Sequence, residues 1–152
     1  MILKDLDTGN KTLIDDYIEN NPDRKLGGRS RLESLNGETK IIQGYRLPTK
    51  LIFYNINNGR FKQEYISLSR KYGGDLDSRK PEDAKKIQNL LLTLGEKDGK
   101  ISADTHRTMN DIKKKGQLEL GIITQDGFLV DGNRRMAVIN KLFEENQESK
   151  YE

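Results

Sequence analysis

Apolar residues recur at helical spacing in three stretches of the first two thirds of the chain, and residues that stop helices follow each one. The first stretch lies within residues 1–20 and ends at Asn20-Asn21-Pro22. The second ends at Gly73-Gly74, and the third begins at Pro81 and ends at Gly95. The spacing therefore predicts three amphipathic helices. Their apolar faces are Leu13, Ile14, Tyr17 and Ile18, then Phe61, Tyr65, Leu68 and Tyr72, then Ala84, Ile87, Leu90, Leu91 and Leu94.

The last third of the chain predicts a helix, a hairpin and a second helix. Asp104 or Thr105 can cap the first helix, which carries Met109 and Ile112 inward and ends at Gly116. Short strands are expected over 121–124 and 128–130, with a turn at Gln125-Asp126-Gly127 between them. Another helix then starts near Asp131 or Asn133. The residues expected to face the core from this helix are Met136, Ile139, Leu142 and Phe143.

Two earlier segments show no helical periodicity, so their structure is predicted from their amino-acid composition. Residues 39–54 are rich in strand-forming residues, with a break or edge at Pro48, and residues 55–60 read as a turn. Residues 23–31 are basic and glycine-rich without a period, so a mobile loop is expected. That loop is either a solvated connector or a contact to a phosphate. Together with the helices, these strands predict one α+β domain followed by a polar tail over 144–152.

The amino-acid composition excludes several kinds of functional site. Charged residues make up 34% of the 152 residues, but the net charge is only +3, which is too small by itself to argue for nucleic-acid binding. The chain has no cysteine, which excludes disulfides, thiolate metal sites and thiol catalysis, and its one histidine argues against a zinc site built from imidazoles. No apolar run approaches membrane-spanning length, so a cytoplasmic protein without a membrane partner is expected.

The segment Asp131-Gly132-Asn133-Arg134-Arg135 is the candidate functional centre. Two arginines in the first turn of a helix stand at the end where the helix dipole disfavours cations. The same turn has free backbone N–H groups that favour an anion, so a bound phosphate would resolve the conflict. Gly132 would let the backbone approach the ligand, Asn133 could cap the helix or donate to the ligand, and Asp131 could orient an arginine, hold a metal or act as a base. Alternatively, Asp131 pairs with one arginine, glutamates elsewhere in the chain satisfy the other, and no ligand binds.

The other candidate residues give weaker support for a functional site. His106 lies on a polar helix face, where an ordinary solvated histidine is expected. The carboxylates of Asp75, Asp77, Glu82 and Asp83 could hold a divalent ion, but a solvated loop and a charged helix start explain them better, so no metal site is assigned. Tyr45, Tyr54, Phe61 and Tyr65 could stack on bases near Arg46 and Arg60. Packing in the core is the more ordinary role for most of these aromatic residues.

The order of these segments resembles the N-terminal domain of ParB proteins, within the ParB/sulfiredoxin superfamily. The resemblance rests on a helix that ends in Lys114-Lys115-Gly116, a strand through Ile122-Ile123, a short hairpin, and the Gly132-Asn133-Arg134-Arg135 turn that opens the next helix. Residues 47–52 and the asparagine-rich turn 55–60 also resemble that family's first strand and the turn after it. The resemblance covers about 45–61 and 104–143, which implies an inserted helical pair over 62–103 and leaves residues 1–44 outside.

The family resemblance implies a small mixed sheet flanked by helices and a site that binds phosphates. ParB domains bind CTP through this turn, so CTP or another nucleotide with Mg²⁺ is the implied cofactor. Gly132, Arg134 and Arg135 match the phosphate turn, and Arg60 matches the arginine after the first strand. Asn133 replaces the glutamate or histidine usual at its position, which sets this chain apart from a ParB-type hydrolytic role. The sulfiredoxin cysteine is absent.

Three functional hypotheses follow. The first is a ParB-like domain that binds nucleotide or DNA phosphates, as part of a protein of chromosome segregation, regulation or defence. The second is an enzyme on the same scaffold, such as a nuclease, a nucleoside triphosphatase or a small-molecule kinase, with Asp131, Asp126 or Glu119 as its base. The third is a protein-interaction module without a ligand. A homodimer, or neighbouring domains in a larger chain, would fit each of them.

Overall fold

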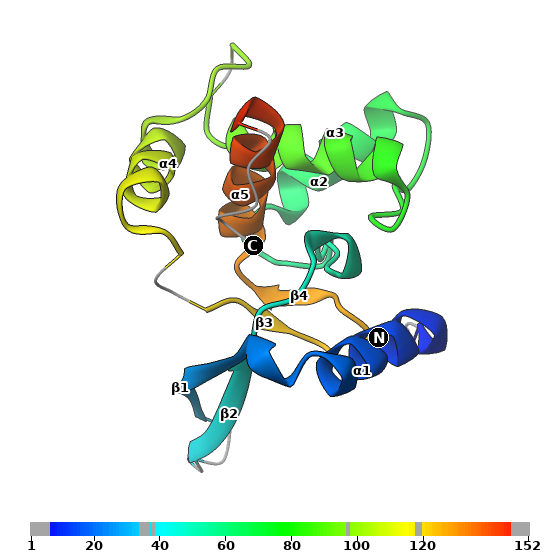
Figure 1. Ribbon diagram of the computed structural model, residues 1–152. Coiled ribbons are helices and arrows are strands. Elements are labelled where there is room, and N and C mark those ends of the chain that lie inside the picture. Colours follow the sequence, from blue (N-terminus) through cyan, green and yellow to red (C-terminus); the bar gives the residue numbers. More distant parts are fainter. Residues whose placement is uncertain (1–6, 34–36, 38, 97, 118–119, 147–152) are drawn as a thin grey trace.

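The computed structural model describes residues 7–33, 37, 39–96, 98–117 and 120–146 (Figure 1). The described part is an α+β domain in which helices dominate and strands form two separate antiparallel pairs. None of its helices is both long and apolar enough to cross a membrane. In chain order the elements are α1 (Thr8–Asn20), the 3-10 turn η1 (Pro22–Arg24), β1 (Lys25–Glu33), β2 (Thr39–Tyr45), η2 (Thr49–Leu51), α2 (Lys62–Lys71), α3 (Pro81–Leu92), α4 (Ala103–Lys115), β3 (Ile122–Ile123), β4 (Leu129–Asp131) and α5 (Asn133–Asn146).

All five predicted helices are present, and their ends follow local chemistry. Asp7 caps α1 by accepting the N–H of Asn10 at 3.0 Å. Pro81 begins α3, as predicted. The cap of α4 is Ser102, whose hydroxyl accepts the N–H of Thr105 at 3.2 Å, so the expectation of Asp104 or Thr105 as the cap was wrong by two or three residues. Asp104 instead lies in the first turn, where a carboxylate also suits the helix dipole.

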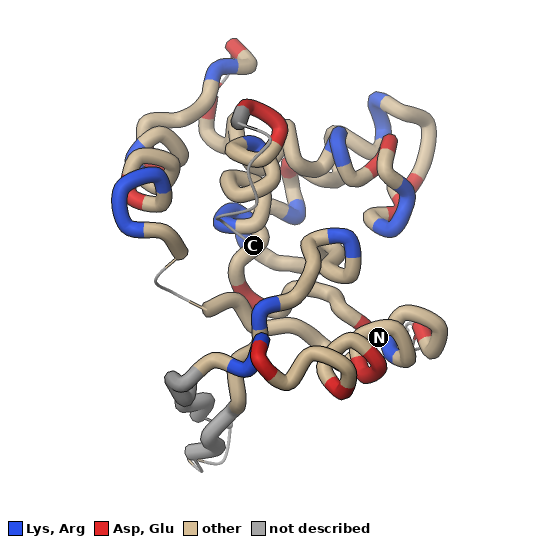
Figure 2. The backbone as a smooth tube through the Cα atoms, in the orientation of Figure 1, with Lys and Arg blue, Asp and Glu red and all other residues tan. Residues whose placement is uncertain are grey.

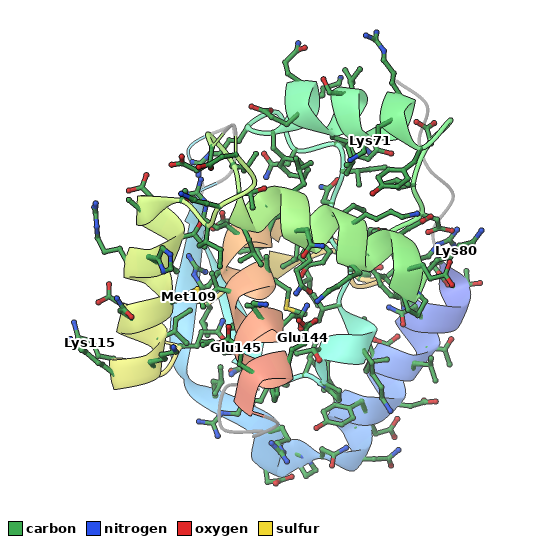
Figure 3. All side chains as sticks on the ribbon, turned by 90° about the horizontal axis from the view of Figure 1, so that it is seen from above. Lys71, Lys80, Met109, Lys115, Glu144 and Glu145 are labelled. Carbon is green, nitrogen blue, oxygen red and sulfur yellow. The ribbon has the colours of Figure 1, made fainter. Side chains whose placement is uncertain are left out.

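Helix α5 is the centre of the core. It lies between α3 and α4, and α2 packs on α3 (Figures 1 and 3). The predicted face of α5 is buried through Met136, Ile139 and Leu142. Ala137 and Val138, on another side of the helix, are buried as well because neighbouring helices cover α5 from two directions. The core cluster consists of Tyr54, Phe61, Tyr65, Leu76, Ile87, Leu91, Leu92, Met109, Ile112, Leu129, Met136, Ala137, Val138, Ile139 and Leu142.

The α2–α3 pair forms as predicted but is not a peripheral addition beside a sheet. Ile87, Leu91 and Leu92 of α3 are almost completely buried, and Leu90 and Leu94 pack partly buried against the same cluster. The apolar stripe of α3 predicted a buried face correctly. It could not show that the surface covered by this face is α5, because such a stripe does not encode its partner.

Two predicted segments differ in the structure. Residues 23–31, expected as a loop, form η1 and most of β1, which pairs antiparallel with β2. Within residues 39–54 the break expected at Pro48 is present, because β2 ends at Tyr45 and Pro48 precedes the 3-10 turn η2, but the expected second stretch of strand is not continuous. Only Phe53 returns to strand pairing, through an isolated parallel bridge to Phe128. Proline lacks the N–H that a continuous strand would donate, which explains the interruption.

Helix α1 is fastened to the β3–β4 hairpin by one buried asparagine. The Asn10 side-chain amide donates to the carbonyl oxygens of Leu51 at 3.0 Å and Asp126 at 2.7 Å. Asp126, which was weighed as a catalytic base, is itself buried and accepts the backbone N–H of Asp7 at 3.0 Å and the hydroxyl of Thr124. Its carboxylate therefore organises the hairpin and the start of α1.

A polar chain runs from the surface to the buried hydroxyl of Tyr54. Asn140 donates to this hydroxyl at 2.9 Å, the hydroxyl donates to Gln88 at 3.4 Å, and Gln88 donates to Glu144 at 3.2 Å. Burial raises the pKa of Tyr54 above its usual range. The chain ends where Lys85 of α3 pairs with Glu144 of α5, so it ties these two helices together.

We expect the Glu144 pair to make stability depend on pH in the acidic range. Partial burial acts to raise the pKa of Glu144, but hydrogen bonds from Lys85 and Gln88 outweigh it and lower the pKa. The contribution is therefore present above the usual pKa of a glutamate and disappears as the pH falls through the lowered value. Melting temperatures measured from pH 7 to pH 3 should fall less steeply for Glu144→Gln than for the unaltered protein. Glu145→Gln, one residue further along α5, should leave the pH profile unchanged.

Candidate functional site

A cleft of about 410 Å³ opens where the start of α5, the end of α4 and the turn after Tyr54 meet. It brings together all six residues predicted for the site: Arg60, Asp131, Gly132, Asn133, Arg134 and Arg135. These residues come from two regions more than seventy positions apart in the chain. Its other lining residues are Asn58, Phe61, Leu91, Leu94, Thr108, Asp111, Ile112, Lys115, Gly116 and Gln117.

The start of α5 is built as predicted. Strand β4 ends at Asp131, and α5 begins at Asn133, so Arg134 and Arg135 lie in its first turn. The carbonyl of Gly132 accepts the N–H of Met136 at 2.8 Å, which closes the first helical turn. Gly132 has a φ of 107°, and a Cβ added there would lie 3.4 Å from the Cα of Gly121. The positive φ favours glycine at this position, and an added Cβ would contact the backbone of Gly121, which precedes β3.

The basic groups enter the cleft from three elements. Arg134 on α5 and Arg60 before α2 are exposed, and Lys115 is the last residue of α4. Arg135 is partly buried, and its Nη1 donates to the carbonyl of Leu120 at 3.3 Å, so part of its guanidinium is held against the chain that precedes β3. Lysines and arginines are seen at the end of α4 and near the start of α5 in Figure 2.

Within the described residues, no carboxylate forms an ion pair with Arg60, Lys115 or Arg134. Asp131 lines the cleft and is exposed, but it is not paired with Arg134. The alternative that Asp131 neutralises one of the two arginines therefore has no support in this arrangement for Arg134. Four cationic residues, Arg60, Lys115, Arg134 and Arg135, line the recess with two aspartates, Asp111 and Asp131, which leaves the cleft net positive.

Asn133 has a different role from the predicted one. Its side chain is buried and turned to the backbone of Asn55: Oδ1 accepts the N–H of Asn55 at 2.9 Å, and Nδ2 donates to the Asn55 carbonyl at 3.3 Å. Both functions of the amide are thus engaged by protein. Asn133 fastens the turn that carries Arg60 to the helix that carries Arg134 and Arg135, so it positions the arginines around the cleft.

Removing this connection should loosen the cleft and the fold together. Asn133→Ala leaves two backbone groups of Asn55 without their partners, which typically costs about 1–3 kcal/mol of unfolding free energy. Asn55→Ala is the matched control, because the Asn55 side chain accepts only the exposed N–H of Asn57 at 3.0 Å while its backbone stays bound to Asn133. Urea unfolding should show a clearly larger loss for Asn133→Ala. Equal stability of the two variants would refute the role assigned to Asn133.

Apolar residues also line the cleft. Phe61, Leu91 and Ile112 are buried, and Leu94 is partly buried. Helix α3 and the residues after it therefore contribute to the site, although the helical pair had been expected to lie away from the active centre. A recess lined by both apolar and cationic side chains suits a ligand that has both an apolar part and an anionic part.

The other described candidate groups, apart from Phe61, do not line the cleft. His106 is exposed on α4, and Asp77 is bound to Arg79. No cluster of three or more potential metal ligands is found among the described residues. Tyr54, Phe61 and Tyr65 are buried in the core, as the packing interpretation expected. Glu119 lies outside the described residues.

Sequence reasoning missed three polar residues that line the cleft from α4: Thr108, Asp111 and Lys115. The available signal was the run Lys113-Lys114-Lys115 before Gly116. Lysines at the end of a helix also stabilise the negative end of the helix dipole. That ordinary role already explained the run, so the contribution of Lys115 to the cleft was not predicted.

No family model, curated protein or solved structure matches this chain.

Proposed function

We propose that this domain binds the phosphate groups of a nucleotide or a nucleic acid in the cleft at the start of α5. The observation that carries the proposal is the convergence of Arg60, Arg134, Arg135 and Lys115 on one recess next to a helix N-terminus. Arginine forks pair with phosphate oxygens in a bidentate way, and the free N–H groups of the first helical turn favour the same charge.

Two further features support a phosphate ligand. Gly132 carries no side chain next to the first turn of α5, so a phosphate could approach the free backbone N–H groups there. The apolar residues that line the cleft beside the cations, Leu94 among them, would contact a nucleobase, as binding of a mononucleotide would require. By its resemblance to ParB, the domain would serve a DNA-associated protein of segregation, regulation or defence, with CTP and Mg²⁺ as the first ligands to try.

Titration calorimetry with pyrophosphate, CTP, ATP and a short DNA duplex, each with and without Mg²⁺, tests the proposal. We expect heat of binding for at least one phosphate ligand, and we expect it to weaken as salt is added. If none of them binds at millimolar concentration, the cleft is not a phosphate site. The hypothesis of a protein-interaction module without a ligand would then be favoured.

A second candidate, turnover of the bound phosphate compound, is favoured by one observation. Asp111 and Asp131 line the same cleft from α4 and β4, and two carboxylates with a bound triphosphate form a common setting for Mg²⁺. Asp131→Asn should then abolish Mg²⁺-dependent release of phosphate while leaving nucleotide binding without Mg²⁺ in place. Release of phosphate that is unchanged in Asp131→Asn would remove the catalytic role assigned to that residue.

A further inference from the structure

The strands β1 and β2 form a ribbon that extends from the body of the domain, at the opposite end from α2 and α3 (Figure 1). Its pairing runs in regular register from Glu33 opposite Thr39 to Arg29 opposite Gln43, and after a shift it closes with Lys25 opposite Tyr45. Neither strand pairs with a third strand within the described residues. Within the described residues, both edges of the ribbon are therefore unpaired.

The ribbon and the two arginines that flank it are rich in positive charge. Residues 24–46 contain six basic and two acidic residues, a net charge of +4, whereas the whole chain carries +3. The remainder of the chain is therefore slightly acidic. Four of the basic residues belong to the strands, and two flank them at the base, where the N–H of Arg46 donates to the carbonyl of Arg24 at 2.9 Å. The six are Arg24, Lys25, Arg29, Arg31, Lys40 and Arg46.

We propose that the β1–β2 ribbon binds duplex DNA by entering the major groove. The major groove of B-form DNA, about 12 Å wide, admits a two-stranded antiparallel ribbon. A strand of nine residues such as β1 spans roughly 30 Å at about 3.3 Å per residue, enough to follow a groove across several base pairs. The groove is flanked by phosphates on both sides, which matches basic residues on both strands.

The shape of the ribbon separates DNA from duplex RNA. The major groove of an A-form helix is deep and too narrow for side chains to read, so the same ribbon would not enter it. Binding by charge alone would not distinguish the two duplexes. The preference for B-form DNA is therefore the feature that the proposed geometry adds to simple attraction.

The base of the ribbon lies next to the cleft. A Cβ added to Gly44 in β2 would lie 3.0 Å from a methyl carbon of Leu120, so the ribbon packs closely on that residue. The carbonyl of Leu120 in turn accepts the hydrogen bond from Arg135. A duplex bound along the ribbon would thus pass near the arginines of the cleft. The ribbon proposal nevertheless stands without the cleft, because its residues are different.

Fluorescence anisotropy with a labelled 20-base-pair DNA duplex tests the ribbon. The triple variant Arg29→Gln, Arg31→Gln, Lys40→Gln should weaken binding by about tenfold or more. It should also lower the slope of log affinity against log salt by up to about 2.7, because each lost phosphate contact contributes about 0.9. The control Lys62→Gln, Arg70→Gln, Lys71→Gln removes the same charge from α2, whose end is marked by Lys71 in Figure 3, and should change affinity less than about twofold.

Several outcomes would overturn the inference. They are no duplex binding by the unaltered protein, equal losses in the ribbon and α2 variants, and equal affinity for a duplex RNA of the same sequence. Polyglutamate that competes as well as unlabelled duplex would show attraction to acids of any kind. Pyrophosphate binding separates the two proposals, because the ribbon variant should retain it whereas Arg134→Ala should weaken it by roughly 10–100-fold. Melting temperatures close to that of the unaltered protein would confirm that the variants are folded.

Discussion

Replacing Gly127 with alanine should destabilise the domain by about 2–5 kcal/mol, the sum of a backbone penalty of about 1–2 kcal/mol and an overpacking penalty of about 1–3 kcal/mol. Gly127 lies in the turn between β3 and β4 with a φ of 93°, which side chains rarely adopt. A Cβ there would lie 2.3 Å from the Leu51 carbonyl oxygen and 2.6 Å from the Asn10 amide nitrogen. Neither atom can retreat easily, because one is backbone and the other is held by two hydrogen bonds.

Two other glycines separate these contributions. Gly73 has a φ of 79° but nothing within 4 Å of an added Cβ, so Gly73→Ala should show the backbone penalty alone. Gly59 has open space and no positive φ, so Gly59→Ala should have almost no effect. Urea denaturation of the three variants should therefore rank Gly127→Ala well below Gly73→Ala, with Gly59→Ala close to the unaltered protein. A Gly127 variant no less stable than the Gly73 variant would contradict the close contact with α1.

Removing both arginines at the start of α5 should have the largest effect on ligand binding. A hydrogen bond to a charged partner is typically worth about 1.5–3 kcal/mol, so Arg134→Ala and Arg135→Ala should each weaken phosphate binding by roughly 10–100-fold. The double variant should weaken it by about 100-fold or more, although two residues that share a ligand need not be additive. Arg60→Ala should weaken the same ligand, since its side chain lines the same cleft. Titration calorimetry with the best phosphate ligand measures all of these effects.

The two arginines should differ in their effect on stability. Arg134 is exposed, so its loss should leave the melting temperature nearly unchanged. Arg135 also donates to the Leu120 carbonyl, and its loss should cost about 0.5–1.5 kcal/mol of unfolding free energy. Arg70→Ala, an exposed arginine on α2, is the control for charge removal elsewhere. Large losses of stability from Arg134→Ala, with binding unchanged, would favour the ion-pair alternative over a phosphate site.

The strand, turn and helix at the site could be predicted because their signals are local. The glycine at position 127 specifies the turn, and the apolar period after Asn133 specifies α5 and places Arg134 in its first turn. The ribbon could not be predicted in the same way. Gly27-Gly28 and the charges of β1 obscure the alternation of a strand, and the pairing that makes it one depends on β2, which no local pattern in β1 reveals.

In the cleft, too, some features could be predicted from the sequence and others depend on contacts between distant residues. The resemblance to ParB predicted that Arg60 would meet Arg134 and Arg135, and the cleft contains all three. The role of Asn133 escaped prediction because an asparagine that begins a helix normally caps that helix. Here its partner is the backbone of Asn55, a contact between residues 78 positions apart that is known only once the chain is folded.

The contacts of Asn10 determine where the domain can be cut. A fragment that starts at residue 45, the first position of the ParB resemblance, would lack α1 and so leave the carbonyls of Leu51 and Asp126 without their amide donor. It would also open the surface beneath Gly127, which the Ile14 side chain of α1 approaches. Residues from Asp7 onward are thus part of the smallest unit that should fold by itself, and expression vectors for this domain should include them.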